Sequence, residues 1–220
     1  MKEIITLLFL FCMISMQAQD WPNLERFQKE NAMINTTDRV VFMGNSITEG
    51  WSNIHPEFFE GKPYVNRGIG GQTTPQMLIR FRQDVVSLHP KLVVILAGIN
   101  DIAGNTGPST LEMIMDNIKS MAEIARANNI KVVLSSVLPA YDFPWSPGLD
   151  PGPKVMRLNA MIKEYCEAQN FIYLDYFSAM VDERNGMDKK YHEDEVHPNI
   201  LGYQVMAPLA EAAIKKAIGN

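Results

Sequence analysis

Val40-Val41-Phe42-Met43-Gly44-Asn45-Ser46-Ile47-Thr48 is the stretch of sequence that decides the fold. Residues 40–43 form a short apolar run of β-branched and aromatic type, which is typical of a strand buried on both faces. Gly44 and Asn45 follow as turn residues, and Ser46 stands at the start of a helical stretch. A buried strand that leads through a tight turn into a helix is the repeating unit of α/β proteins.

The same alternation continues along the chain. Residues 92–96, 132–138 and 171–174 are predicted strands, and residues 64–66 are a weaker candidate. A helix is predicted to open on the capping box Ser109-Thr110-Leu111-Glu112 and to end at residues 128–129. Further helices are predicted over residues 155–169 and after Pro198-Asn199, where Pro208 should introduce a kink. Strands and helices in alternation predict a parallel sheet covered on both faces.

Composition limits the classes of protein to consider. The chain has 220 residues, of which 46% are hydrophobic and 20% charged, which is enough for one well-buried domain. Its formal net charge is -5, and clusters of Lys and Arg are lacking. A nucleic-acid partner is therefore not expected, because phosphate binding needs such clusters.

The first eighteen residues have the features of a secretory signal peptide. Lys2 precedes an apolar stretch at residues 4–14, and cleavage is predicted after Ala18. A membrane anchor is the rival interpretation, but the stretch is shorter than the roughly 20 residues that span a bilayer. Lipid attachment at Cys12 is another, although bulky Phe11 stands where lipoprotein signals have a small residue. We expect a signal peptide at residues 1–18, one domain at residues 19–220, and a secreted or periplasmic protein without stable membrane insertion.

Cleavage would leave Cys166 as the only cysteine, so no intramolecular disulfide is possible in the mature chain. Cys166 lies in the predicted helix at residues 155–169. We expect a buried, small apolar residue there and not a nucleophile.

Three polar turns follow three of the predicted strands. Gly44–Thr48 follows the first, Arg67–Thr74 the second and Gly98–Asp101 the third. Ligands of open α/β sheets bind beyond the carboxyl ends of the strands. These three turns are therefore expected at one edge of the sheet, where a ligand would bind.

Each turn has two interpretations. Ser46 could expose a nucleophilic hydroxyl and a free backbone N–H, or could simply cap a helix. The glycine-rich turn could aim N–H groups at an oxyanion, or could be only a tight turn; Thr73 breaks the dinucleotide-binding spacing. Asn100 could donate an uncharged amide N–H to an oxyanion, although asparagine is common in turns.

Asp194-Glu195-Val196-His197 supplies a base and a carboxylate to orient it. Two alternatives remain for this region. Residues 189–195 could be a solvated charged loop, or His192, Glu193, Asp194 and His197 could bind a metal. The spacing of His192 and His197 does not match a helical pair of ligands at i and i+4, so we predict neither a metal nor an organic cofactor.

In order and content these segments resemble the four blocks of the SGNH hydrolase family, also called GDSL-type esterases. The blocks look like Gly44–Ile47, Asn66–Gly71, Gly98–Asp101 and Asp194–His197. The resemblance implies a flavodoxin-like, three-layer αβα sandwich around a five-stranded parallel sheet. It also implies that Ser46 is the nucleophile, that Asp194 and His197 complete a triad, and that the Ser46 N–H, Gly71 and Asn100 form the oxyanion hole.

The sequence departs from the family pattern at two positions. Asn45 and Ile47 replace the Asp and Leu of the GDSL signature. Asparagine keeps an oxygen acceptor but loses the charge, so the turn should survive while an electrostatic role does not. The glycine register is open as well, since Gly68 or Gly70 could present the N–H in place of Gly71.

A serine esterase that acts on a small-molecule or glycan ester follows from this resemblance. Secretion favours O-acyl groups on carbohydrate, with acetyl the simplest. Tyr141 and Trp145 follow the fourth strand and could stack on sugar rings or only fix a proline-rich loop. The alternatives are a lysophospholipase or platelet-activating-factor-acetylhydrolase-like lipid esterase, and a non-catalytic binding module. The sequence leaves the natural ester and the oligomeric state open.

Overall fold

A computed structural model describes residues 19–219 of the protein; the predicted signal peptide at residues 1–18 lies outside the described residues. Five parallel strands form one sheet in the order β2-β1-β3-β4-β5. The strands are β1 (Val40–Gly44), β2 (Tyr64–Gly68), β3 (Leu92–Ile95), β4 (Lys131–Ser135) and β5 (Ile172–Leu174). The α-helices are α1 (Gln28–Met33), α2 (Ser46–Ile54), α3 (Thr74–Asp84), α4 (Ile99–Ile102), α5 (Leu111–Ala127), α6 (Pro151–Gln169), α7 (Phe177–Met180) and α8 (Ile200–Ile218), with 3-10 turns η1 (Pro56–Phe58), η2 (Val86–Leu88) and η3 (Lys189–Tyr191).

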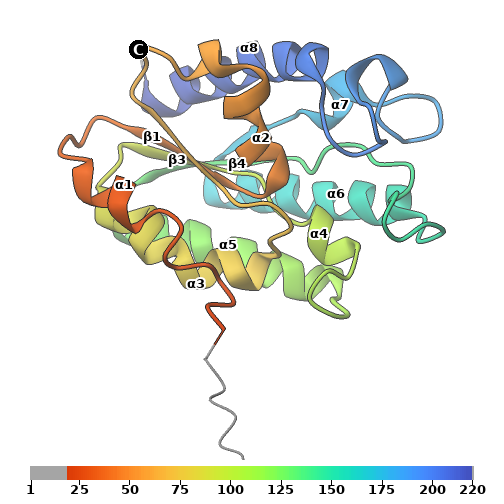
Figure 1. Ribbon diagram of the computed structural model, residues 1–220, viewed down its shortest axis with the longest axis horizontal. Helices are drawn as coiled ribbons and strands as arrows, with labels where there is room; N and C mark the ends of the chain where they lie inside the picture. The colour runs from red at the N-terminus through yellow and green to blue at the C-terminus, as the bar shows by residue number, and fades with distance from the viewer. Residues whose placement is uncertain (1–18, 220) are drawn as a thin grey trace, which may run out of the picture.

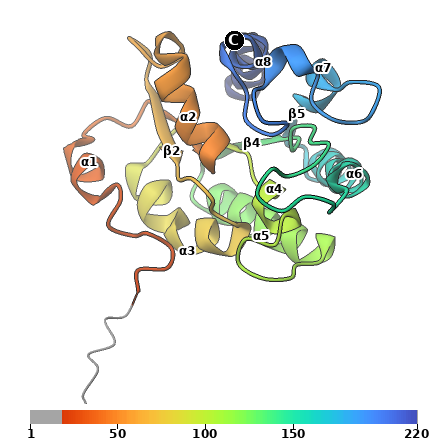
Figure 2. The same ribbon diagram turned by 45° about the vertical axis from the view of Figure 1, so that its right-hand side comes forward.

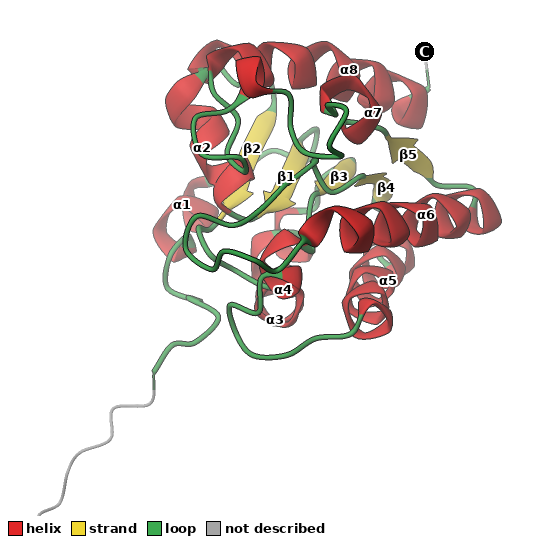
Figure 3. Ribbon diagram, turned by 90° about the vertical axis from the view of Figure 1, so that its right-hand side faces the viewer, coloured by secondary structure: helices red, strands yellow, loops and turns green. Residues whose placement is uncertain are grey.

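The sheet lies between two layers of helices (Figures 1 and 3). Helices α2 and α8 pack on one face, and α3, α5 and α6 cover the other. Every residue of β1 and β3 is buried, as the continuous apolar runs in the sequence require. The predicted three-layer α/β sandwich with five parallel strands is therefore confirmed. Within residues 19–219, no helix is both long and apolar enough to cross a membrane.

The strand order has a switch point between β1 and β3. From β1 the chain moves outward to β2 and then returns past β1 to β3, so the loops after β1 and β3 leave in opposite directions. Ligands of open α/β sheets bind at such a switch point. Ser46 begins α2 directly after β1, and Asn100 lies in α4 directly after β3. The topology thus brings two of the predicted site residues to the same switch point.

Several element boundaries differ from the prediction, three of them for a clear local reason. The helix expected from the capping box at Ser109 is capped instead by Thr110, whose side chain accepts from the Met113 N–H. Strand β4 ends three residues early because the Asn159 side chain takes both backbone groups of Val137. Helix α6 begins four residues early, with Pro151 in its first turn, where proline is well tolerated.

Gly68 lets the end of β2 approach the first turn of α2. A Cβ atom at Gly68 would lie 2.1 Å from the backbone nitrogen of Glu49, a distance that no rotamer change can relieve. At Gly152, in α6, the nearest atom to an added Cβ lies at 3.6 Å, which is ordinary contact. The two glycines therefore differ in whether a methyl group fits.

We expect Gly68→Ala to lower the free energy of unfolding by about 3 kcal/mol, because the backbone of β2 or α2 must move to admit the methyl group. Gly152→Ala is the matched control and should be neutral or stabilising by up to about 1 kcal/mol, since alanine favours helix. Urea denaturation of both variants measures the difference. Equal stabilities for the two would show that the approach of β2 to α2 is not tight.

Candidate active site

Ser46 is the first residue of α2, and its hydroxyl is not used to cap the helix. The cap is Asn45, whose Oδ1 accepts from the Ile47 N–H at 3.1 Å. Asparagine thus keeps the acceptor role of the aspartate that it replaces, while its buried Nδ2 has no hydrogen-bond partner among the described residues. The alternative that Ser46 is only a helix cap does not agree with this geometry.

The Ser46 hydroxyl instead faces His197 from the far end of the sequence. Ser46 Oγ lies 2.8 Å from His197 Nε2, and His197 Nδ1 lies 2.6 Å from Asp194 Oδ2. Both distances are those of hydrogen bonds. A hydroxyl, an imidazole and a carboxylate in such a chain can transfer the hydroxyl proton to the imidazole.

Backbone contacts hold Asp194 in place. Its Oδ1 accepts from the N–H groups of His197 at 2.7 Å and Val196 at 3.1 Å. Partial burial raises the pKa of Asp194, but these bonds and the bond to the His197 ring outweigh burial, so the pKa lies below its ordinary value of 3.8. Asp194 is therefore ionised at neutral pH and can stabilise a positively charged imidazole.

His192 belongs to the same loop but has another partner. Its Nδ1 accepts from the Glu195 N–H at 2.7 Å, and Glu195 has a left-handed backbone with φ 71°. The two histidines thus bind different groups, His192 the backbone of Glu195 and His197 the carboxylate of Asp194. Among residues 19–219, no group of three or more His, Cys, Asp or Glu side chains is arranged to hold a metal ion.

The glycine-rich turn lies against Ser46, and the N–H groups of its three candidate glycines differ in their hydrogen bonds. A Cβ atom at Gly70 would lie 3.9 Å from the Cβ of Ser46. The Gly68 N–H donates to Asn66 and the Gly70 N–H donates to Glu49, each at 2.8 Å. Gly71 is exposed, has φ 74°, and its N–H has no acceptor within residues 19–219. Of the three candidates, Gly71 has the N–H that remains available to a ligand.

Asn100 lies near the same turn. It is 3% exposed, and its Nδ2 donates to the backbone carbonyl of Gln72 at 3.0 Å. An amide nitrogen carries two hydrogens, so one N–H remains for a second acceptor. Asn100 is held in position by the turn to which Gly71 belongs.

The aromatic residues of the loop after β4 lie in two different places. Trp145 is 45% exposed, and the centroid of its ring lies 6.0 Å from that of the His197 ring. Tyr141 packs instead under the guanidinium of Arg184, which lies 4.4 Å from the centre of its ring. Trp145 therefore borders the triad, whereas the contacts of Tyr141 are with the loop after α7.

Asp101 is a buried carboxyl that the sequence did not single out. Its two oxygens accept from the Thr74 N–H at 3.0 Å, and its Oδ1 also accepts from the Thr74 hydroxyl at 2.6 Å. Burial raises the pKa of Asp101 to about 6, although these hydrogen bonds act in the opposite direction. Asp101 thus ties α4, which carries Asn100, to the start of α3.

A raised carboxyl pKa makes stability depend on pH in a defined direction. The contribution of Asp101 is complete below its unfolded pKa of about 3.8 and is lost as pH rises through about 6, because the folded protein disfavours the charged form. The full change is about 3 kcal/mol. We expect the free energy of unfolding of the unchanged protein, minus that of Asp101→Asn, to fall between pH 4 and pH 7, as measured by urea denaturation. A constant difference over this range would contradict the raised pKa.

The sequence pattern of the GDSL-like Lipase/Acylhydrolase family matches residues 42–205. The chain therefore belongs to this family of carboxylic ester hydrolases, and the resemblance to SGNH hydrolases drawn from the four blocks is confirmed. The matched region spans β1 to α8 and includes Ser46, Asn100, Asp194 and His197.

Solved structures from two Bacteroides species are similar to this chain. A candidate acylhydrolase of Bacteroides fragilis is 47% identical with a TM-score of 0.89, over 92% of this chain and 100% of that one. A GDSL-like lipase of Bacteroides thetaiotaomicron is also 47% identical with a TM-score of 0.86, over 89% and 98% of the two chains.

Curated relatives are more distant. An acetylxylan esterase of Geobacillus stearothermophilus is 23% identical over 70% of this chain and 72% of its own length. The lipoprotein YqeF of Bacillus subtilis, whose function is uncharacterised, is 32% identical over 46% of this chain, and the match spans about half, 48%, of its length.

Proposed function

We propose that this protein is a secreted serine esterase that removes O-acyl groups, most simply O-acetyl, from carbohydrate. The observation that supports it best is the chain of hydrogen bonds from Ser46 through His197 to Asp194, at 2.8 and 2.6 Å. In the proposed reaction His197 accepts the Ser46 proton while Ser46 Oγ attacks the acyl carbon. The imidazolium then returns the proton to the departing alcohol, which leaves an acyl-enzyme.

Water completes the reaction in a second step that uses the same groups. His197 takes a proton from a water molecule, the resulting hydroxide attacks the acyl carbon, and Ser46 leaves with the proton that His197 held. Asp194 keeps the imidazole in the required tautomer and stabilises its charged form. Both steps pass through a tetrahedral intermediate with a negatively charged oxygen.

Three donors are proposed for that oxygen: the N–H of Ser46, the N–H of Gly71 and the free N–H of Asn100. The first belongs to the opening turn of α2, where backbone N–H groups lack partners within the helix. The other two are supported by the hydrogen-bond pattern of the glycine-rich turn. Preorganised, uncharged hydrogen-bond donors stabilise the oxyanion more than the carbonyl from which it forms.

The open position of the triad supports a substrate with a small acyl group on a large alcohol. The side chains of His197 and Asp194 are 37% and 39% exposed, so a polymer can approach them without entering a deep cavity. The exposed ring of Trp145 beside His197 can stack on a sugar, as aromatic faces in carbohydrate sites do. The acetylxylan esterase among the relatives agrees with this proposal, and the predicted signal peptide would deliver the enzyme to such glycans.

A panel of esters tests the substrate class. We expect hydrolysis of p-nitrophenyl acetate to exceed that of longer p-nitrophenyl esters, and acetate release from acetylated xylo-oligosaccharides to exceed lysophospholipid hydrolysis. A serine-directed fluorophosphonate should label the protein but not Ser46→Ala. Preference for long acyl chains would support the lipid esterase instead. Absence of both turnover and labelling would support a binding module without catalysis.

A further inference from the structure

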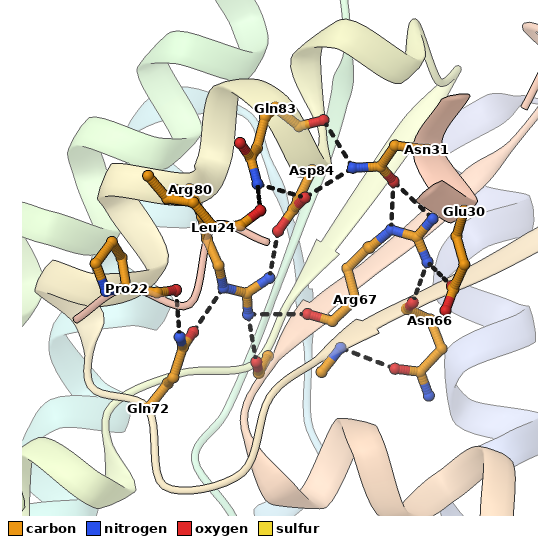
Figure 4. A network of polar contacts seen from close by, with 12 residues as sticks. Pro22, Leu24, Glu30, Asn31, Asn66, Arg67, Gln72, Arg80, Gln83 and Asp84 are labelled. Atoms are coloured by element: carbon orange, nitrogen blue, oxygen red, sulfur yellow. Dashed lines mark hydrogen bonds and ion pairs between the residues drawn. The ribbon is translucent and has the colours of Figure 1, made fainter. Parts of the chain in front are cut away.

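Gln72, the residue that follows Gly71, belongs to a buried polar network (Figure 4). Its Oε1 accepts from Arg80 Nε at 2.6 Å, and its Nε2 donates to the carbonyl of Pro22 at 2.7 Å. Its backbone carbonyl accepts from Asn100 Nδ2 at 3.0 Å. One residue thus touches the N-terminal segment, a buried cation and a proposed oxyanion donor.

Arg80 anchors this network to the sheet. Its side chain is fully buried, and Nη2 donates to the carbonyls of Gly44 at 3.0 Å and Arg67 at 2.9 Å. Gly44 ends β1 two residues before Ser46, and Arg67 is the penultimate residue of β2. Burial lowers the pKa of Arg80 to about 10, partly offset by Asp84 at 3.1 Å, so the guanidinium is charged at neutral pH. Its charge-assisted bonds therefore fix Gln72 relative to the strand ends that carry Ser46 and the glycine-rich turn.

The N-terminal segment, defined here as residues 20–34, lies along the β2 side of the sheet against α3 (Figure 2). Three of its backbone carbonyls accept hydrogen bonds from glutamine side chains of the turn and of α3. The pairs are Gln76 with Trp21 at 2.7 Å, Gln72 with Pro22 at 2.7 Å and Gln83 with Leu24 at 2.5 Å. Of these three glutamines, Gln72 is the one whose backbone also binds Asn100.

Gly71 and Asn100 each depend on Gln72 for their position. Gly71 has no side chain to hold it, so its N–H is placed by the bond that its carbonyl accepts from Asn105 Nδ2 at 3.2 Å and by its anchored neighbours, Gly70 through Glu49 and Gln72 through Arg80. Asn100 gives one amide hydrogen to the Gln72 carbonyl, and this bond directs the other hydrogen. A shift of Gln72 would therefore move two of the three proposed oxyanion donors together.

We propose that Gln72 is a positioning residue for the oxyanion hole, and that the N-terminal segment supports it through the Pro22 carbonyl. The inference rests on the proposed function, because it concerns donors to the oxyanion of that reaction. Gln72 does not touch the substrate. It acts on the transition state through Gly71 and Asn100, so its loss should affect kcat and not KM.

The test compares Gln72→Met with Gln83→Met in p-nitrophenyl acetate hydrolysis. Gln83→Met removes a bond of the same kind to the N-terminal segment without touching the glycine-rich turn. We expect Gln72→Met to lower kcat by roughly 10- to 100-fold with KM nearly unchanged, as for a small misplacement of catalytic groups. Inhibition by methaneboronic acid, whose serine adduct mimics the tetrahedral intermediate, should weaken by a similar factor. Gln83→Met should retain the kcat and inhibition of the unchanged protein.

A double-mutant cycle then places Gln72→Met in an Asn100→Ala background. If Gln72 acts largely through Asn100, its effect on kcat should shrink there, whereas simple loss of stability would give equal factors in both backgrounds. Undiminished kcat in folded Gln72→Met would overturn the inference, and equal factors in both backgrounds would overturn the part of it that runs through Asn100. Should Gln72→Met not fold, Gln72→Asn, too short to reach both Arg80 and Pro22, is judged by the same outcomes. Failure of the proposed function is separate, since the unchanged protein would then lack Ser46-dependent turnover.

Discussion

Ser46→Ala and His197→Ala are each expected to lower kcat for p-nitrophenyl acetate by about 10⁶-fold, and the double variant to be no worse than either. The reason is that the two residues act as one unit. Without His197 the Ser46 hydroxyl is a weak nucleophile, and without Ser46 the base has no proton to remove. The residual rate should come from the oxyanion donors and from binding alone.

His192→Ala is a suitable comparison for the histidine variant. His192 lies in the same loop but binds the backbone of Glu195 and not Ser46. Its loss should therefore cost much less activity than the loss of His197. Thermal unfolding of each variant would show whether the fold persists. A double variant far below both single variants would mean that Ser46 and His197 contribute independently, contrary to the proposed mechanism.

Asn100→Ala has the second largest expected effect, a fall in kcat of roughly 10²- to 10³-fold with little change in KM. The amide would donate more strongly to the oxyanion than to the ester carbonyl, so its loss raises the barrier without weakening substrate binding. Steady-state kinetics with p-nitrophenyl acetate separates the two constants.

Two further variants decide how that fall is interpreted. Asn100→Asp replaces the donor by a carboxylate and should be at least as slow as Asn100→Ala, because an ionised carboxylate cannot donate to an oxyanion. Asn117→Ala is the control. It removes an α5 side chain that donates to the hydroxyl of Thr74, the first residue of α3, and the variant should keep its activity. If Asn100→Ala retained full kcat, Asn100 would have no place in the oxyanion hole.

Much of the fold followed from the apolar runs. Strands β1 and β3 are buried throughout, and β4 is buried in all but Lys131, so their sequences are almost entirely apolar. Strand β2 was weaker because it ends in Asn66, Arg67 and Gly68. Boundaries were less accurate where side chains compete with the backbone. Asn159 takes the hydrogen bonds that would extend β4, and it lies 22 residues from Val137, beyond the reach of local sequence patterns.

Ser46, Asn100, Asp194 and His197 could be selected from the sequence because their blocks are short and ordered. The resemblance to the family favoured Gly71 but left Gly68 and Gly70 open, because the sequence does not show which N–H already has an acceptor. Gln72 was missed because its partners are Arg80, the carbonyl of distant Pro22 and the amide of distant Asn100. Arg80 and Asp84 did leave a signal: an ion pair at i and i+4 that shares a helix with buried Met77 and Phe81. A charged pair among apolar residues marks a buried network.

The contact between Ser46 and His197 joins residues that are 151 positions apart in the chain. Such distant contacts are among the slowest to form, because the intervening chain must lose its freedom before the ends meet. His197 lies just before α8, which packs on β3, β4 and β5. Helix α8 is the last helix of the chain, whereas α2, which carries Ser46, is near its start. Recovery of esterase activity during refolding would therefore report the last docking of the chain, later than the return of helical or strand content.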